Sequence, residues 1–269
     1  MNKLIKIAMA TSLIAGSIAT SQACTLGAWD DNGTSTAIAG GPGEPAGPTN
    51  FARYSGLCAM QTAGATPSVK NNGAGGATSG PSGEATMNAR FYFKADGATG
   101  TIFETYEEDV PVTAVYTVAF DGTNVTVTPN AGGSATSTAV GSTNWHSVEV
   151  SWANNGGAIN VWVDSDATTD PADASTTSEA SGDTINTAIL GGVTGMTFDA
   201  YESRRTTPIG RLVAGDANND TNVNIFDAIG VVNESSGGGL INVGQPDCNE
   251  DGNINIFDAI CVVNIASGN

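Results

Sequence analysis

Several short runs in the first two hundred residues alternate apolar and polar side chains. Residues 87–94 place Met, Ala and two Phe on one side and Asn, Arg, Tyr and Lys on the other, and residues 147–152 and 159–164 repeat the pattern. A period of two is typical of a β-strand with one buried face. The same reasoning predicts further strands at residues 112–120, 124–128, 185–190 and 196–201.

Turn-forming residues separate these runs, and the region shows no helical period. Asp-Gly pairs stand at 96–97 and 121–122, and the second pair predicts a hairpin between two strands. Many short strands joined by turns predict a mainly β fold, an antiparallel jelly-roll sandwich. Residues 40–50, 71–83 and 164–183 are predicted to be surface loops. The last is acidic, but its carboxylates lack the spacing of metal ligands.

The pattern changes near the C-terminus, where residues 216–234 and 247–265 align with an offset of 31. Such a duplication indicates two copies of one structural unit. Each copy predicts a helix with an apolar stripe at spacing i, i+4, i+7. The stripes consist of Ile225, Ile229 and Val232 and of Ile256, Ile260 and Val263. We therefore expect a sandwich over residues 24–211 and a small α-helical module over residues 212–269.

Ahead of each helix, side-chain oxygens recur at positions 1, 3, 5, 7, 9 and 12 of a loop. This is the ligand spacing of an EF-hand-like calcium loop, so two calcium ions are predicted. The predicted ligands are Asp216, Asn218, Asp220, Asn222, Asn224 and Asp227 in the first loop and Asp247, Asn249, Asp251, Asn253, Asn255 and Asp258 in the second. Val223 and Ile254, at position 8, are expected to pack the loops together.

The two loops differ at position 6, where the chain must turn sharply and Gly is usual. The second loop has Gly252, whereas the first has Thr221. A positive φ at a β-branched residue costs about 1–3 kcal/mol. The second loop is therefore predicted to bind calcium more tightly.

The duplicated unit resembles the type I dockerin, which implies docking onto a cohesin-like protein. Dockerins carry hydroxyl residues at loop positions 10 and 11 and often a basic pair at 17 and 18. This chain has Ile-Phe at the first pair, at 225–226 and 256–257, and Val-Asn at the second, at 232–233 and 263–264. Either the partner differs from a cohesin, or the module docks on its own chain or on a second copy.

The body of the chain carries a second resemblance. Residues 144–152, which begin Asn-Trp-His-Ser-Val, together with residues 157–164 and 196–202, resemble strands of laminin-G-like, concanavalin A-like lectin/glucanase domains. The resemblance covers roughly residues 25–211. It implies a jelly roll whose concave face or loops hold glycans or glycoproteins, sometimes through calcium.

No catalytic residues are assigned. Glucanases of that fold carry Glu-x-Asp-x-x-Glu, but the acidic run at 104–109 has Tyr at its third position. In an extended strand Glu104 and Glu108 would lie about 13 Å apart, too far for a retaining pair at about 5–5.5 Å. His146 is predicted to be structural and Trp152 to lie in the core. Of the tryptophans, Trp162 is the better candidate for an exposed sugar platform, although packing against the other sheet is the commoner explanation for such a residue.

Composition and charge narrow the function further. The 269 residues are 40% hydrophobic and only 13% charged, with a net charge of −18. Such a surface repels phosphate backbones and attracts cations, so no nucleic-acid partner is expected. The single His argues against a His-based metal or triad site.

Residues 1–23 read as a secretory signal peptide, with Lys3 and Lys6 ahead of an apolar stretch and small residues before Cys24. We expect a secreted, periplasmic or cell-surface protein without a transmembrane segment; a lipid-modified Cys24 is the alternative. Export permits disulfides, and proximity favours Cys24–Cys58 and Cys248–Cys261 among three pairings, with free buried thiols as the alternative.

These features favour an exported, calcium-binding, non-catalytic protein. A lectin-like domain would bind a polysaccharide or glycoprotein, and a dockerin-like module would dock it, in polysaccharide catabolism or cell-surface attachment. A glycoside hydrolase or polysaccharide lyase with unlocated carboxylates is one alternative, because dockerins often accompany such enzymes. A structural surface or matrix protein is another.

Overall fold

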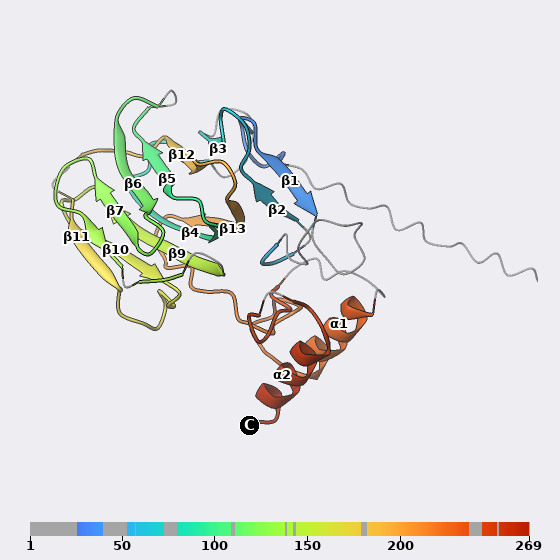
Figure 1. Cartoon of the computed structure of the whole chain (residues 1–269). Coiled ribbons are helices and arrows are strands. Elements are labelled where there is room, and N and C mark those ends of the chain that lie inside the picture. Colours follow the sequence, from blue (N-terminus) through green and yellow to red (C-terminus); the bar gives the residue numbers. More distant parts are fainter. Residues whose placement is uncertain are drawn as a thin grey trace, which may run out of the picture.

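Two antiparallel β-sheets stack on each other and carry a pair of helices at one end (Figure 1). The computed structural model describes residues 26–39, 53–56, 58–72, 80–108, 111–137, 139–141, 144–178, 182–236, 244–251 and 253–268. The predicted signal peptide, Cys24 and Gly252 therefore lie outside the described residues. Within the described part of the chain, no helix is long and apolar enough to cross a membrane.

The seven-stranded sheet runs in the order β1 (Thr36–Ala39), β2 (Cys58–Gln61), β13 (Thr197–Arg204), β4 (Thr86–Lys94), β9 (Trp145–Ala153), β10 (Ala158–Val163) and β11 (Ala174–Thr177). The six-stranded sheet runs in the order β3 (Ser68–Asn71), β12 (Thr187–Gly191), β5 (Gly100–Tyr106), β6 (Ala114–Phe120), β7 (Val125–Pro129) and β8 (Ala135–Thr136). Every strand pair is antiparallel, as the sequence predicts.

The core lies between the two sheets and is rich in aromatic rings. Phe91 of β4 lies 5.4 Å, between ring centroids, from Phe103 of β5, and Phe93 of β4 lies 5.2 Å from Phe120 of β6. These contacts join one sheet to the other, and all four side chains are buried. Trp152 of β9 belongs to the same cluster, which confirms its predicted place in the core.

The outer face of the seven-stranded sheet is covered as well. The period of two places Arg90 and Tyr92 of β4 on the polar side, yet both are buried. The chain after β13 crosses them: Arg90 donates to the Gly210 carbonyl at 2.8 Å, and the Leu212 amide donates to the Tyr92 hydroxyl at 2.8 Å. This crossing leads the chain directly to the C-terminal helices.

The three predicted loops need correction or lie wholly or partly outside the described residues. The predicted loop at 164–183 contains an edge strand, β11, whose backbone pairs with β10 although its Ser and Thr side chains give no apolar period. The predicted loop at 71–83 begins at the last residue of β3, and its residues 73–79 lie outside the described residues, as do residues 40–50.

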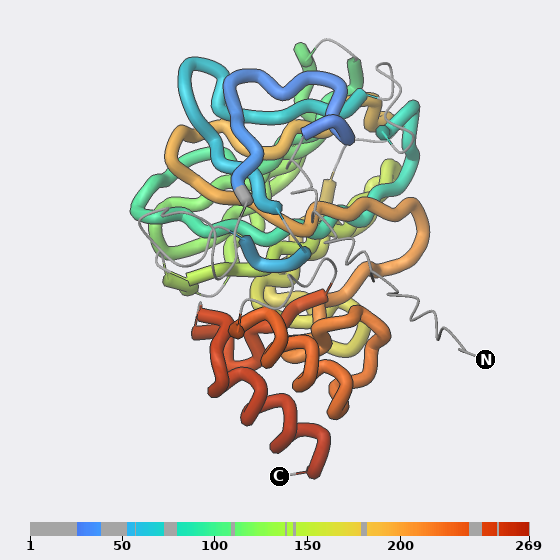
Figure 2. The backbone as a smooth tube through the Cα atoms, turned by 90° about the vertical axis from the view of Figure 1, so that its right-hand side faces the viewer, coloured from blue at the N-terminus to red at the C-terminus, as the bar shows by residue number. Residues whose placement is uncertain are grey.

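Helices α1 (Ile225–Ser235) and α2 (Ile256–Ala266) begin identically. Asn224 and Asn255 are extended N-caps, with φ of −149° and −151°, and each forms a capping box with the Asp three residues later. The helices lie side by side at one end of the sandwich in both views (Figure 2). The predicted Cys248–Cys261 disulfide is present, and Cys58 is also disulfide-bonded.

Candidate functional site

The two loops that precede α1 and α2 fold in the same way. In the first loop, both oxygens of the Asp216 carboxylate accept backbone amides, from Asp220 at 3.0 Å and Thr221 at 2.7 Å. In the second, Asp247 accepts the Asp251 amide at 3.2 Å. The first carboxylate of each loop therefore lies on the inside of a turn made by the following residues.

The last carboxylate of each loop closes the turn from the first turn of the helix. Asp227 accepts amides from Asn218 at 3.1 Å and Asn224 at 2.9 Å, and Asp258 accepts the equivalent pair from the second copy. Both Asp side chains are completely buried. Among the described residues, no three acidic, His or Cys side chains converge as a group that could hold a metal. The carboxylates instead accept hydrogen bonds from backbone amides of the loops. The predicted calcium ligands also include the side-chain amide oxygens of Asn, and oxygen ligands of this kind suit a hard cation.

Position 6 of the first loop has the predicted backbone conformation. Thr221 has a φ of +71°, in the left-handed region that a β-branched residue rarely adopts. The equivalent Gly252 lies outside the described residues. The predicted strain is therefore present in the first loop, and its effect on calcium affinity stays a prediction.

The two copies pack together through small apolar groups. The cluster contains Ala228 and Val231 of α1 and Ala259 and Val262 of α2, with Ile254 buried and Val223 packed against them. Val223 and Ile254 therefore join the loops to the shared core, as predicted. The segments that lead into the two loops also pair with each other. The Gly215 amide donates to the Gln245 carbonyl at 2.9 Å, and the Gln245 amide donates to the Asp216 carbonyl at 2.9 Å.

The module is attached to the sandwich by polar contacts on its loop side. Arg53 and Glu234 of α1 form a completely buried ion pair. Glu250 of the second loop accepts from the Tyr54 hydroxyl at 3.1 Å and from Arg211 at 3.0 Å. Sequence reasoning missed this interface, because Glu234 and Glu250 look like ordinary exposed acids.

Asp199 of β13 holds the segment that makes these contacts. Its carboxylate accepts the amides of Tyr54 at 2.6 Å and Ser55 at 2.8 Å. Burial raises the pKa of Asp199 to about 6, although the hydrogen bonds from these amides act in the opposite direction. Asp199 thus positions Arg53 and Tyr54 against the module.

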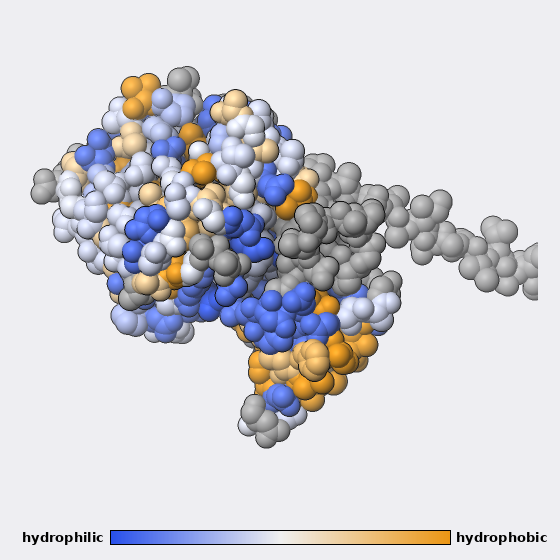
Figure 3. All heavy atoms as spheres, viewed as in Figure 1, coloured by the Kyte–Doolittle hydropathy of each residue, from blue (hydrophilic) through white to orange (hydrophobic). Residues whose placement is uncertain are grey.

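The opposite side of the helices is apolar and exposed. We call it the apolar helix face, and no charged side chain belongs to it. Its eight members are exposed over 40–72% of their surface and form a continuous hydrophobic surface below the loops (Figure 3). They are Ile225, Phe226, Ile229, Val232, Ile256, Phe257, Ile260 and Val263. A groove of about 380 Å³ runs between the helices, with Ala228 and Ala259 among its lining residues.

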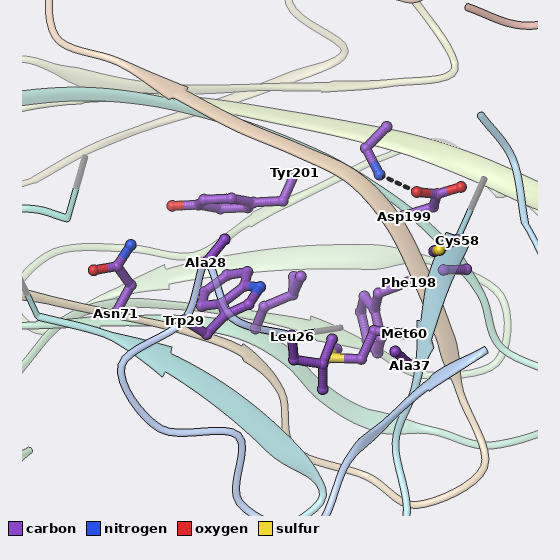
Figure 4. A pocket seen from close by; sticks show the side chains of 13 residues that line it. Leu26, Ala28, Trp29, Ala37, Cys58, Met60, Asn71, Phe198, Asp199 and Tyr201 are labelled. Carbon is purple, nitrogen blue, oxygen red and sulfur yellow. Dashed lines mark hydrogen bonds between the residues drawn. The ribbon is translucent and has the colours of Figure 1, made fainter. Parts of the chain in front are cut away.

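The sandwich itself has a cavity of about 340 Å³ beside β2 and β13 (Figure 4). Trp29 and Tyr201 line it, with ring centroids 4.9 Å apart, and Asn71 and Asp199 are also among its lining residues. Burial raises the pKa of Tyr201 to about 12, so its phenol stays protonated at neutral pH. Aromatic faces with a few polar groups form a pocket of the size that takes a small ligand.

The other singled-out side chains do not form a site. Trp162 is 8% exposed and donates to the Asp170 carbonyl at 3.1 Å, so it does not form the exposed sugar platform for which it was the candidate. His146 is buried with Nδ1 2.7 Å from Asp164, as expected of a structural residue. Burial raises the pKa of Glu104, whereas a bond from the Thr113 amide lowers the pKa of Glu108.

No protein-family model and no curated protein sequence matches this chain. Among solved structures it is similar to domains LG4–5 of the mouse laminin α1 chain, with 12% identity and a TM-score of 0.35 over 66% of this chain and 42% of that one. A heptameric SAP-like pentraxin from Limulus polyphemus is 13% identical, with a TM-score of 0.36 over 63% of this chain and 75% of the pentraxin chain. The binding domain of botulinum neurotoxin serotype D is 8% identical, with a TM-score of 0.40 over 64% of this chain and 43% of the neurotoxin chain. The chain spans less than half of the laminin and neurotoxin chains, and we therefore base its function on its own residues.

Proposed function

We propose that this protein is a calcium-binding, non-catalytic protein of the cell exterior. Its dockerin-like module docks on a protein partner, and its sandwich binds a polysaccharide or glycoprotein. The observation that carries the proposal is the duplicated loop–helix unit, in which the same six oxygen positions precede two helices with one uncovered apolar face.

The twelve Asp and Asn side chains of the two loops would hold two calcium ions. Bound calcium would supply positive charge to loops that each place three carboxylates at ligand positions, in a chain with a net charge of −18. It would also add stability to a module whose core consists of a few small residues.

Calcium titration of the full chain by calorimetry tests the proposal. Two ions per chain are expected in the wild type. Asp227→Asn together with Asp258→Asn should abolish binding or weaken it by at least about 100-fold, because each loop loses a buried carboxylate. Asp121→Asn, at an exposed turn of the sandwich, is the matched control and should leave binding unchanged. No heat of binding in the wild type would contradict the proposal.

The cavity beside β13 is the proposed glycan site. Aromatic rings stack on the apolar faces of sugar rings, and Asn71 adds a polar side chain to the lining that suits sugar hydroxyls. On a glycan array, Trp29→Ala should lower binding by about tenfold or more while calcium binding stays intact. Reducing-sugar release from a bound polysaccharide would contradict a non-catalytic role, and loss of that release in Glu104→Gln would assign it to the acidic run.

A further inference from the structure

The apolar helix face is turned away from the rest of the chain that the structure describes. Glu234 and Val231 project from the other side of α1, and Glu234 is the residue that contacts the sandwich through Arg53. The module therefore already contacts its own chain, through Glu234 of α1 and Glu250 of the second loop. Ile229 and Ile260, on the opposite face, are exposed and lack a partner among the described residues.

We infer that this face pairs with the same face of a second copy of the chain, to form a dimer. The inference rests on the docking role proposed above and names its partner. The two repeats place a ridge and a groove on one surface: Ile225, Ile229 and Val232 stand one turn apart along α1, beside the groove lined by Ala228 and Ala259. In a two-fold symmetric dimer both copies use the same surface, so that surface must carry both a ridge and the groove that receives it. Here the ridge of one copy would pack into the groove of the other.

The area of the face agrees with a dimer. An aromatic side chain carries roughly 150–250 Å² and Ile or Val somewhat less, and the eight residues of the face are exposed over 40–72% of their surface. Together they present on the order of 800 Å², which is about what each partner contributes to a standard-size stable interface. A monomer rarely leaves a patch of this size in water.

Charge points to the same occupant. Each copy has a net charge of −18, so most surfaces of two copies repel each other. The face carries no charged side chain, because the acids of the two helices, Asp227, Glu234 and Asp258, are all buried. Two copies can therefore meet here without placing like charges in contact, and added salt should strengthen the dimer by screening the repulsion elsewhere.

Sedimentation velocity of the full chain in calcium tests the inference. The wild type should sediment with the mass of two chains at micromolar concentration, and more completely at high salt. Ile229→Glu with Ile260→Glu should weaken the dimer by at least about 100-fold, since each substitution removes buried apolar area and adds a charge. Val112→Glu is the control, because Val112 is 76% exposed on the sandwich, and it should stay dimeric.

Calcium titration of each variant separates loss of pairing from loss of folding, and Ile229→Gln with Ile260→Gln repeats the test without new charge. A wild type that stays monomeric at high salt while binding calcium would overturn the dimer and leave the proposed calcium role intact. A dimer that survives both double substitutions would also overturn it. Sedimentation of a monomeric wild type with phosphatidylcholine vesicles would assign the face to lipid instead.

Discussion

The two repeats of the C-terminal module share their local geometry and differ in how they are anchored. Both helices begin at an Asn N-cap with the same φ to within a few degrees, and both loops turn around buried Asp side chains. The first repeat is tied to the sandwich through the buried Glu234, whereas the second contacts it through the exposed Glu250 and is also locked internally by Cys248–Cys261. Shared residues therefore set the shape of each unit, and the few differing residues set what each unit is attached to.

Replacing Glu234, which ties the first repeat to the sandwich, by the residue of the second repeat should have the largest effect on stability. Ile265 occupies the position in the second repeat that Glu234 has in the first, and it is exposed. Glu234→Ile removes the carboxylate that Arg53 contacts in a buried site and should lower the free energy of unfolding by about 3–5 kcal/mol. Denaturant unfolding followed by circular dichroism measures this.

The reciprocal substitution Ile265→Glu is the control and should change stability by no more than about 0.5 kcal/mol, because its side chain stays in water. Equal effects from the two substitutions would show that the ion pair does not distinguish the repeats.

Removing the disulfide of the second repeat should have the next largest effect on stability. Cys248→Ala with Cys261→Ala opens a link across 13 residues, which should lower stability by about 3 kcal/mol through the larger entropy of the unfolded chain. The first repeat has Ala217 and Gly230 at these positions and folds without a crosslink. Urea unfolding measures the loss, and an unchanged midpoint would mean that calcium or the sandwich contacts already hold the second repeat.

The smallest effect concerns the turn at position 6. Thr221 has a φ of +71°, so Thr221→Gly relieves about 1–3 kcal/mol of strain and should raise the calcium affinity of the first loop by about tenfold or more. Gly252→Thr should weaken the second loop in turn. Calorimetry that finds two equal sites in the wild type would refute the predicted order.

Sequence patterns predicted the strands that have a clear period of two, but they missed β1, β2, β3, β5 and β8, although Ile102 and Phe103 of β5 are buried in the core. The alternation at 87–94 placed Phe91 and Phe93 in the core, where both lie. The loop spacing anticipated the left-handed turn at Thr221. The edge strand β11 was missed because its Ala-Ser-Thr-Thr sequence carries no apolar period, and its strand conformation comes from pairing with β10.

What the sequence determined by itself is periodic and local: the strands with a period of two, the duplicated loops and the existence of one apolar side on each helix. A period shows that a helix has an apolar side but not where that side points. Only the tertiary structure decided that Glu234 is buried against Arg53, 181 residues away along the chain, and that Ile229 and Ile260 are exposed. The reason is that burial depends on what a distant segment brings to a surface, and the covering of Tyr92 by the chain near Leu212 is set in the same way.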